Sequence, residues 1–159
     1  MLCQKICIPV ALQRYVAPTP VVLRQIEMGK ILASHYGAEL AIVTVEAPVP
    51  LLPHLEATEV KLENLAAPVV TDGYNVTVRY DEGIPSRAIR SFVDEWSADT
   101  VIIGSHSKRG ILDVGVGSTA SALRHDLKAM VLMVRPTQEE SNKAKELMIP
   151  TYPFVFPYG

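Results

Sequence analysis

The chain has 159 residues, of which 48% are apolar and 20% are charged. This length predicts one domain that buries about two-thirds of its unfolded surface, and the composition excludes a disordered or collagen-like protein. The 15 basic and 17 acidic side chains give a net charge of −2, without the basic block that a nucleic-acid-binding protein needs. No apolar run approaches the roughly 20 residues that span a bilayer, so we expect a cytoplasmic protein without membrane insertion.

The two cysteines, Cys3 and Cys7, fall in a stretch that predicts a strand, where they would lie about 13 Å apart. A disulfide requires Cα atoms within about 7 Å of each other, so we expect two free thiols in the core. Because there is no other cysteine and no histidine pair at ligand spacing, the sequence predicts no structural metal site.

Five short apolar runs rich in β-branched residues predict strands, and the segments between them are long enough for helices. The predicted strands cover residues 5–10, 39–45, 75–80, 100–104 and 129–135. Three segments between them carry apolar residues at helical spacing: Val22, Ile26, Gly29 and Ala33; Leu55, Leu62 and Leu65; and Ile89, Phe92, Val93 and Trp96. This alternation predicts an α/β domain, in which a parallel sheet carries helices on both faces.

The segment after the fourth predicted strand is the best candidate for a binding site, because ligands of open α/β sheets bind at the carboxyl ends of the strands. The residues of interest are Gly104, Ser105, His106, Ser107 and Lys108, and then Gly117, Ser118 and Thr119 at the predicted start of a helix. Glycines let backbone N–H groups approach an anion closely, and a helix N-terminus offers free N–H donors. Residues 104–135 contain five basic and two acidic side chains, so this segment suits a phosphate group.

The same features also have a purely structural interpretation. Ser118 would serve as an ordinary N-cap, and basic residues near the end of the helix would offset its dipole. The segment matches neither the P-loop of nucleotide hydrolases nor the dinucleotide-binding pattern G-x-G-x-x-G. On spacing alone, phosphate binding and a structural loop remain equal alternatives.

The stretch from Val101 to Pro136 resembles the C-terminal half of universal stress protein domains. The family motif G-x2-G-x9-G-[ST] falls on Gly104, Ser107 and Gly117–Ser118, with three of its four positions matched. The opening strand from Lys5 is also similar to the first strand of the family, and the resemblance covers residues 3–136. It divides the chain into a universal stress protein-like domain, 1–136, and a C-terminal extension, 137–159.

This resemblance implies a Rossmann-like five-stranded parallel sheet in the order 3-2-1-4-5 and a homodimer formed through the last strand. That strand contains Val131, Leu132, Met133 and Val134. The nucleotide-binding branch of the family further implies ATP or AMP, alone or with Mg2+, with phosphates on the motif and adenine on the main chain near Val45. The implied nucleotide-binding residues are Pro9, Val10, Val45, Gly104, Ser105, His106, Ser107, Lys108, Gly117, Ser118 and Thr119.

The sequence departs from the nucleotide-binding pattern of the family at two positions. Ala11 stands where the family has an aspartate in the nucleoside pocket, which removes a charge-assisted hydrogen bond worth about 1.5–3 kcal/mol. Ser107 replaces the second motif glycine, and the connection from Leu12 to Pro20 is longer than usual. The phosphate half of the implied site is therefore better kept than the nucleoside half.

The sequence predicts no catalytic arrangement. The nucleophile elbow G-x-S-x-G does not occur, and the four histidines lie in different elements. Among them, His106 alone falls in the phosphate loop, where two roles are open to it: donation to a phosphate oxygen, which we favour, and proton transfer near neutral pH. We therefore expect a protein that is not an enzyme, with at most a slow incidental hydrolysis of nucleotide.

The C-terminal extension changes character along its length. Residues 138–147 predict a short exposed helix, with Glu139 and Lys143 at the i,i+4 spacing of an ion pair. Prolines then alternate with four aromatic residues, Tyr152, Phe154, Phe156 and Tyr158. Prolines exclude a central strand, and rings on one face of an extended chain predict an aromatic anchor that docks on a different protein or on the sister subunit.

Two functions remain open at this point. The first is a regulatory module of a stress response that binds an adenine nucleotide and acts as a dimer. The second is a dimeric docking module without nucleotide, which captures a partner protein through its aromatic tail.

Overall fold

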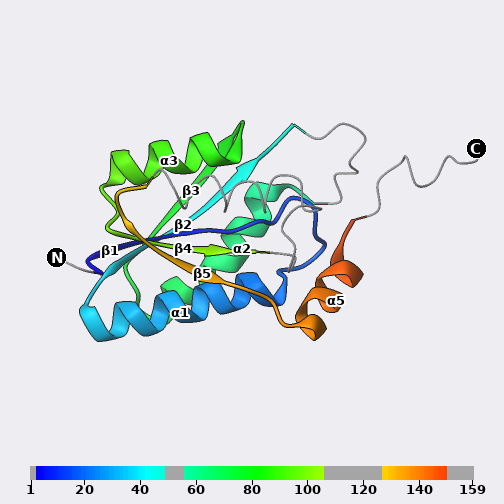
Figure 1. Ribbon diagram of the computed structural model, residues 1–159, viewed down its shortest axis with the longest axis horizontal. Helices are drawn as coiled ribbons and strands as arrows, with labels where there is room; N and C mark the ends of the chain where they lie inside the picture. The colour runs from blue at the N-terminus through cyan, green and yellow to red at the C-terminus, as the bar shows by residue number, and fades with distance from the viewer. Residues whose placement is uncertain (1–2, 49–55, 106–126, 150–159) are drawn as a thin grey trace, which may run out of the picture.

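The computed structural model describes residues 3–48, 56–105 and 127–149 of the chain. Their elements are β1 (Lys5–Pro9), α1 (Pro20–Tyr36), β2 (Glu39–Glu46), α2 (Thr58–Thr71), β3 (Val76–Glu82), α3 (Pro85–Trp96), β4 (Thr100–Gly104), β5 (Met130–Val134) and α5 (Gln138–Leu147). The strands form a five-stranded sheet in the order β3-β2-β1-β4-β5, and each neighbouring pair is parallel. The predicted α/β fold and strand order are thereby confirmed (Figure 1).

Helices cover both faces of this sheet, as the sequence predicts. Ile6 and Ile8 of β1 pack into a core cluster with α1 and α2, whereas Cys7 between them belongs to a second cluster with α3. Successive side chains of a strand point to opposite faces, so β1, β2, β4 and β5 each contribute side chains to both clusters. Figure 1 shows α3 on one side of the sheet and α1 on the other.

Several predicted boundaries differ from the observed ones. β2 and β3 are longer at their carboxyl ends than predicted, because their ladder continues to the pair Glu46 and Glu82. Cys3 was expected in the first strand, but it lies two residues before β1 and has a positive φ of 55°. The thiols of Cys3 and Cys7 are nevertheless both free and buried, and burial raises the pKa of Cys7.

The first part of the C-terminal extension packs on the domain. α5 has the predicted bounds, but it is not simply exposed, because Ser141 and Ala144 are buried and Arg24 of α1 donates to Glu140 at 2.7 Å. The predicted partners Glu139 and Lys143 form no ion pair in the part of the chain that the structure describes. α5 is therefore held to α1 by tertiary contacts.

After α5 the chain runs antiparallel to the loop that follows β1. Val16 N–H donates to the Leu147 carbonyl at 2.9 Å, and Ile149 N–H donates to the Arg14 carbonyl at 2.7 Å. The side chain of Ile149 is only 4% exposed. The aromatic anchor begins beyond this point and lies outside the described residues. Over the described ranges, no helix combines the length and apolarity needed to cross a membrane.

Candidate functional site

The strand order reverses between β1 and β4, and this is where the two middle strands separate. Their ladder contains only two residue pairs, Ile6 with Thr100 and Cys7 with Val101. Beyond these pairs, β1 leads toward β2 on one side and β4 toward β5 on the other. Such a switch point at the carboxyl ends of parallel strands is the usual place for a ligand.

Gln25 of α1 closes the inner end of this opening. Its Nε2 donates to the Pro9 carbonyl at 2.7 Å and to the Ile102 carbonyl at 2.9 Å, and the side chain is 1% exposed. The carboxamide thus replaces the ladder hydrogen bonds that β1 and β4 no longer make with each other. Since buried carbonyls need partners, Gln25 fixes the separation of the two strands.

Helix α1 packs so closely on Gly104 that this position has no room for a side chain. A Cβ atom at this position would lie 2.5 Å from Val21 Cγ1 and 2.6 Å from Gln25 Oε1. From the sequence alone, this glycine is expected to allow the close approach of an anion. The structure supplies a second reason, namely that α1 comes too close to β4 for any side chain.

On the other side of the switch point, side-chain hydrogen bonds join the residues that follow β1 to β2 and to the residue after it. Thr44 Oγ1 donates to the Val10 carbonyl at 2.8 Å. Gln13 then pairs with the main chain of Ala47, since its Nε2 donates to the Ala47 carbonyl at 2.7 Å and its Oε1 accepts from the Ala47 N–H at 2.9 Å. These hydrogen bonds attach the loop after β1 to the end of β2 and to the residue that follows it.

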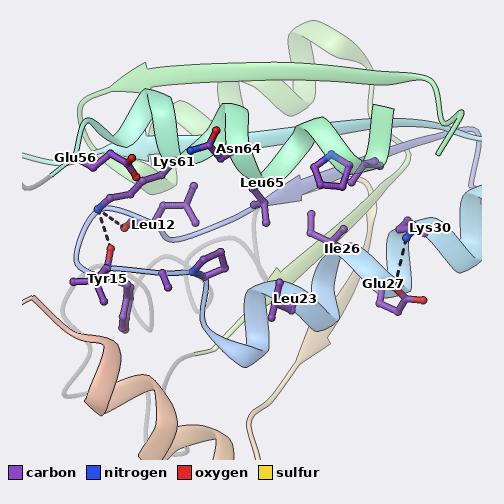
Figure 2. A pocket seen from close by; sticks show the side chains of 15 residues that line it. Leu12, Tyr15, Leu23, Ile26, Glu27, Lys30, Glu56, Lys61, Asn64 and Leu65 are labelled. Carbon is purple, nitrogen blue, oxygen red and sulfur yellow. Dashed lines mark hydrogen bonds and ion pairs between the residues drawn. The ribbon is translucent and has the colours of Figure 1, made fainter. Parts of the chain in front are cut away.

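Lys61 of α2 holds this loop from the opposite side. Its Nζ donates to the carbonyls of Tyr15 at 2.9 Å and Leu12 at 3.3 Å, as Figure 2 shows. Burial lowers the pKa of Lys61, while Glu56 and Glu46 partly offset this effect. The ammonium group thus binds main-chain oxygens in a half-buried place.

A cavity of about 530 Å³ lies beside Lys61, between α1, α2 and the loop after β1 (Figure 2). Its lining is mostly apolar, with Leu12, Ile26 and Leu65 among its residues. None of the predicted nucleotide-binding residues in the described ranges lines this cavity. The cavity and the strand switch point are separate features.

The outer corner of the carboxyl edge, at β2 and β3, is acidic. Tyr80 donates from its hydroxyl to Glu46 at 3.0 Å and to Glu82 at 3.2 Å, and Thr58 donates to the other oxygen of Glu46 at 2.7 Å. Burial first, and then these two carboxylates, raise the pKa of Tyr80, which keeps its proton in place. Two carboxylates make this corner unfavourable for a phosphate group.

The structure brings five of the implied nucleotide-binding residues to the carboxyl edge of β1, β2 and β4. They are Pro9, Val10, Val45, Gly104 and Ser105. Ser105 is buried, and its N–H donates to the Val134 carbonyl at 3.0 Å. The other six, His106, Ser107, Lys108, Gly117, Ser118 and Thr119, lie outside the described residues. Within the described ranges, no group of three His, Cys, Asp or Glu side chains could hold a metal ion.

Three further residues hold this edge together and are not predicted from the sequence, namely Gln13, Gln25 and Thr44. Gln25 had a detectable signal, because it is a polar residue on the apolar face of α1 beside Val22 and Ile26. Gln13 had no such signal, since its partner Ala47 is 34 residues away in the sequence.

β5 lies at one end of the sheet and pairs with β4 alone among the described strands. Met130 N–H donates to the Asp99 carbonyl, and the Val134 carbonyl accepts from Ser105. Because main-chain groups of a strand alternate in direction, those of Val131 and Met133 point away from β4. The main-chain N–H and carbonyl groups of Val131 and Met133 therefore form the outer edge of β5.

Known proteins resemble this chain in sequence and in fold. The sequence model of the Universal stress protein family matches residues 19–135. Universal stress protein Sll1388 from Synechocystis sp. is 30% identical over 86 residues, which are 52% of this chain and 56% of that protein. This match therefore spans little more than half of the relative's length.

Three solved structures share the fold at low sequence identity. A universal stress protein from Archaeoglobus fulgidus has a TM-score of 0.68 and 19% identity over 87% of this chain and 46% of its own. A family protein from Arabidopsis thaliana with AMP bound has a TM-score of 0.65 and 15% identity, over 86% of this chain and 94% of its own. A universal stress protein in complex with cAMP has a TM-score of 0.62 and 21% identity, over 84% of this chain and 98% of its own.

The match to the family model extends from the start of α1 to the residue after β5, and the strand order agrees with the one expected for the family. The chain therefore belongs to the universal stress protein family.

Proposed function

We propose that this protein is a cytoplasmic regulatory module that binds an adenine nucleotide at the carboxyl ends of β1, β2 and β4 and acts as a homodimer through β5. The observation that carries the proposal is the meeting of Pro9, Val10, Val45, Gly104 and Ser105 at the strand switch point. Family members of the same fold hold AMP and cAMP in their solved structures, which supports a nucleotide as the ligand.

The distribution of charge favours one orientation of the nucleotide. The corner at β2 and β3 carries Glu46 and Glu82, whereas residues 104–135 after β4 have five basic and two acidic side chains. Phosphates are attracted to the basic segment and repelled by the carboxylates. The base then lies toward β2 and the phosphates lie toward the motif that starts at Gly104.

ATP and AMP, alone or with Mg2+, are the proposed ligands. The described half of the site fits them in part: the switch point offers main-chain groups of β1, β2 and β4, but the main chain of Ala47 is already paired with Gln13. Among the described residues of this edge, the carboxylates of Glu46 and Glu82 both already accept a hydrogen bond from Tyr80. Because these two carboxylates are engaged with Tyr80, we propose a role in binding nucleotide, with hydrolysis at most incidental.

The test is isothermal titration of the full-length protein with ATP and with AMP, together with analysis of nucleotide released on denaturing the purified protein. We expect saturable binding of at least one of the two. A Gly117→Val variant, which places a side chain where the motif would meet the phosphates, should lose it. Absence of both heat and released nucleotide in the wild-type protein would refute nucleotide binding.

The alternative function is a docking module that captures a partner protein through Tyr152, Phe154, Phe156 and Tyr158. It is favoured by the contacts of residues 147–149, which fix the chain to the domain surface immediately before this aromatic segment. Two results together would support this alternative. The full-length protein would bind a purified partner protein but no nucleotide, and deletion of residues 150–159 would abolish the binding of that partner.

A further inference from the structure

Three main-chain oxygens of the loop after β1 converge on one ammonium group. Lys61 Nζ donates to the carbonyls of Tyr15 at 2.9 Å, Leu12 at 3.3 Å and Gln13 at 3.5 Å. Figure 2 shows the contacts with Leu12 and Tyr15. A primary ammonium group has three N–H donors and no acceptor. The loop therefore offers one oxygen for each donor of the group.

The surroundings of these oxygens favour a positive charge without supplying an ion pair. Burial lowers the pKa of Lys61, whereas the negative charges of Glu56 and Glu46 favour its protonated form. Among the described residues, no carboxylate lies close enough to Lys61 to pair with it directly. Its direct partners are main-chain carbonyls, the ligand type that replaces the hydration shell of monovalent cations in proteins.

The bound charge holds the loop in its observed conformation. The side chains of Leu12 and Tyr15 are 3% and 4% exposed, so the main chain between them runs along the protein interior. Without the ammonium group, three carbonyls at this place would lose a charged donor, which is costly where water does not replace it. The same stretch carries Gln13, which pairs with Ala47 after β2. The loop and its contact with β2 therefore depend on the cation.

A small ion can reach these carbonyls from the cavity between α1 and α2. Lys61, Leu12 and Tyr15 all line that cavity, which has a volume of about 530 Å³. Shortening Lys61 to alanine would extend the cavity toward the three oxygens. Methylammonium has the same donor group as the lysine side chain, so it is the natural probe for the vacated position.

We propose that these three carbonyl oxygens form a binding site for a primary ammonium ion, which the chain fills with its own Lys61. The loop after β1 keeps its conformation while a cation of this kind occupies the site. This inference does not rest on the proposed function, because no nucleotide takes part in it. Since the loop directly follows Val10, the charge of Lys61 controls one border of the carboxyl edge.

The test is chemical rescue of the full-length Lys61→Ala variant by methylammonium chloride. Tetramethylammonium chloride at the same ionic strength is the control salt, because it carries the same charge but no N–H donor. Lys30→Ala is the matched control variant, since Lys30 lines the same cavity but pairs with the carboxylates of Asp72 and Glu27. The measurements are the melting temperature and the backbone amide resonances of residues 13–16 in ¹⁵N-labelled protein.

We expect Lys61→Ala to lower the melting temperature by about 4–8 °C, as the loss of hydrogen bonds to a charged donor implies, and to shift the four loop resonances. Methylammonium should reverse most of both changes saturably, whereas tetramethylammonium should not. Neither salt should restore Lys30→Ala. If Lys61→Ala folds only with added salt, refolding in the two salts makes the same comparison.

Three results would overturn the inference. The first is a Lys61→Ala variant whose loop resonances remain those of the wild type. The second is rescue that is equal in the two salts, or absent in both, because the site would then not recognise an ammonium donor. The third is equal rescue of Lys30→Ala, which would show a general effect of methylammonium on stability.

Discussion

At the scale of single residues, two glutamines define the candidate site. Gln25 of α1 donates to carbonyls of both β1 and β4 where these strands separate. Gln13 joins the loop after β1 to the residue that follows β2. The sequence could identify Gln25 as unusual, because a polar residue interrupts an apolar helix face. It could not identify Gln13, whose role depends on a tertiary contact between two loops.

Replacing Gln25 with Leu should lower the free energy of unfolding by about 2–4 kcal/mol, because two buried carbonyls lose their donors. Urea unfolding at equilibrium measures this change. The control Gln138→Leu removes a carboxamide on the exposed surface of α5 and should cost less than about 0.5 kcal/mol. Equal effects of the two substitutions would show that Gln25 does not carry the strand junction.

Replacing Gly104 with Ala should also destabilise the fold, by about 1–3 kcal/mol, because the added methyl group overlaps Val21 and Gln25. Thermal unfolding is the simplest measurement. Combining Gly104→Ala with Val21→Ala creates room, so the double variant should lose less stability than the sum of the single variants. Strict additivity would contradict close packing as the reason for this glycine.

At the scale of elements, local patterns predicted most of the secondary structure. The bounds of β4 and α5 agree with the sequence analysis, because apolar β-branched runs and helix-capping residues are local signals. The docking of α5 was not predictable, since its ion pair joins Arg24 and Glu140 across 116 positions. The attachment of Met148 and Ile149 to the loop after β1 was not predicted from the sequence either, since their partners, Tyr15 and Arg14, lie far away along the chain.

Ile149 and Met148 provide a matched pair for testing this attachment. Ile149 is 4% exposed and Met148 is 44% exposed. Ile149→Ala should therefore lower the free energy of unfolding by about 2–4 kcal/mol, while Met148→Ala should cost less than about 1 kcal/mol. Deletion of residues 150–159 should leave the melting temperature nearly unchanged. A large loss on that deletion, or no loss in Ile149→Ala, would contradict the packing described for this segment.

At the scale of the whole molecule, the sheet formed by the described residues has two end strands, β3 and β5. An unpaired strand edge invites association, and a two-fold copy of β5 would pair the outward main-chain groups of Val131 and Met133. The family resemblance predicted this dimer, whereas the register of an interface between two copies cannot be obtained from a single sequence. The order of the strands was likewise predicted from the family resemblance, whereas strand–helix alternation alone predicted only a parallel sheet with helices on both faces.

Light scattering should give a dimeric mass for the full-length protein at micromolar concentration. Met133→Pro removes an N–H that points away from β4, so it should abolish the dimer while β4 and β5 stay paired. Leu132→Ala is a control on the same strand that keeps every main-chain donor. A monomeric wild-type protein, or a Met133→Pro dimer of unchanged stability, would place any association on another surface.

The location of the nucleotide can be tested in one titration, by following backbone amide resonances of the ¹⁵N-labelled full-length protein as AMP is added. We expect saturable shifts at Val10, Ala47 and Ser105, which lie at the carboxyl ends of β1, β2 and β4. Shifts confined to residues around the cavity between α1 and α2, or the absence of any saturable shift, would contradict nucleotide binding at the strand switch point.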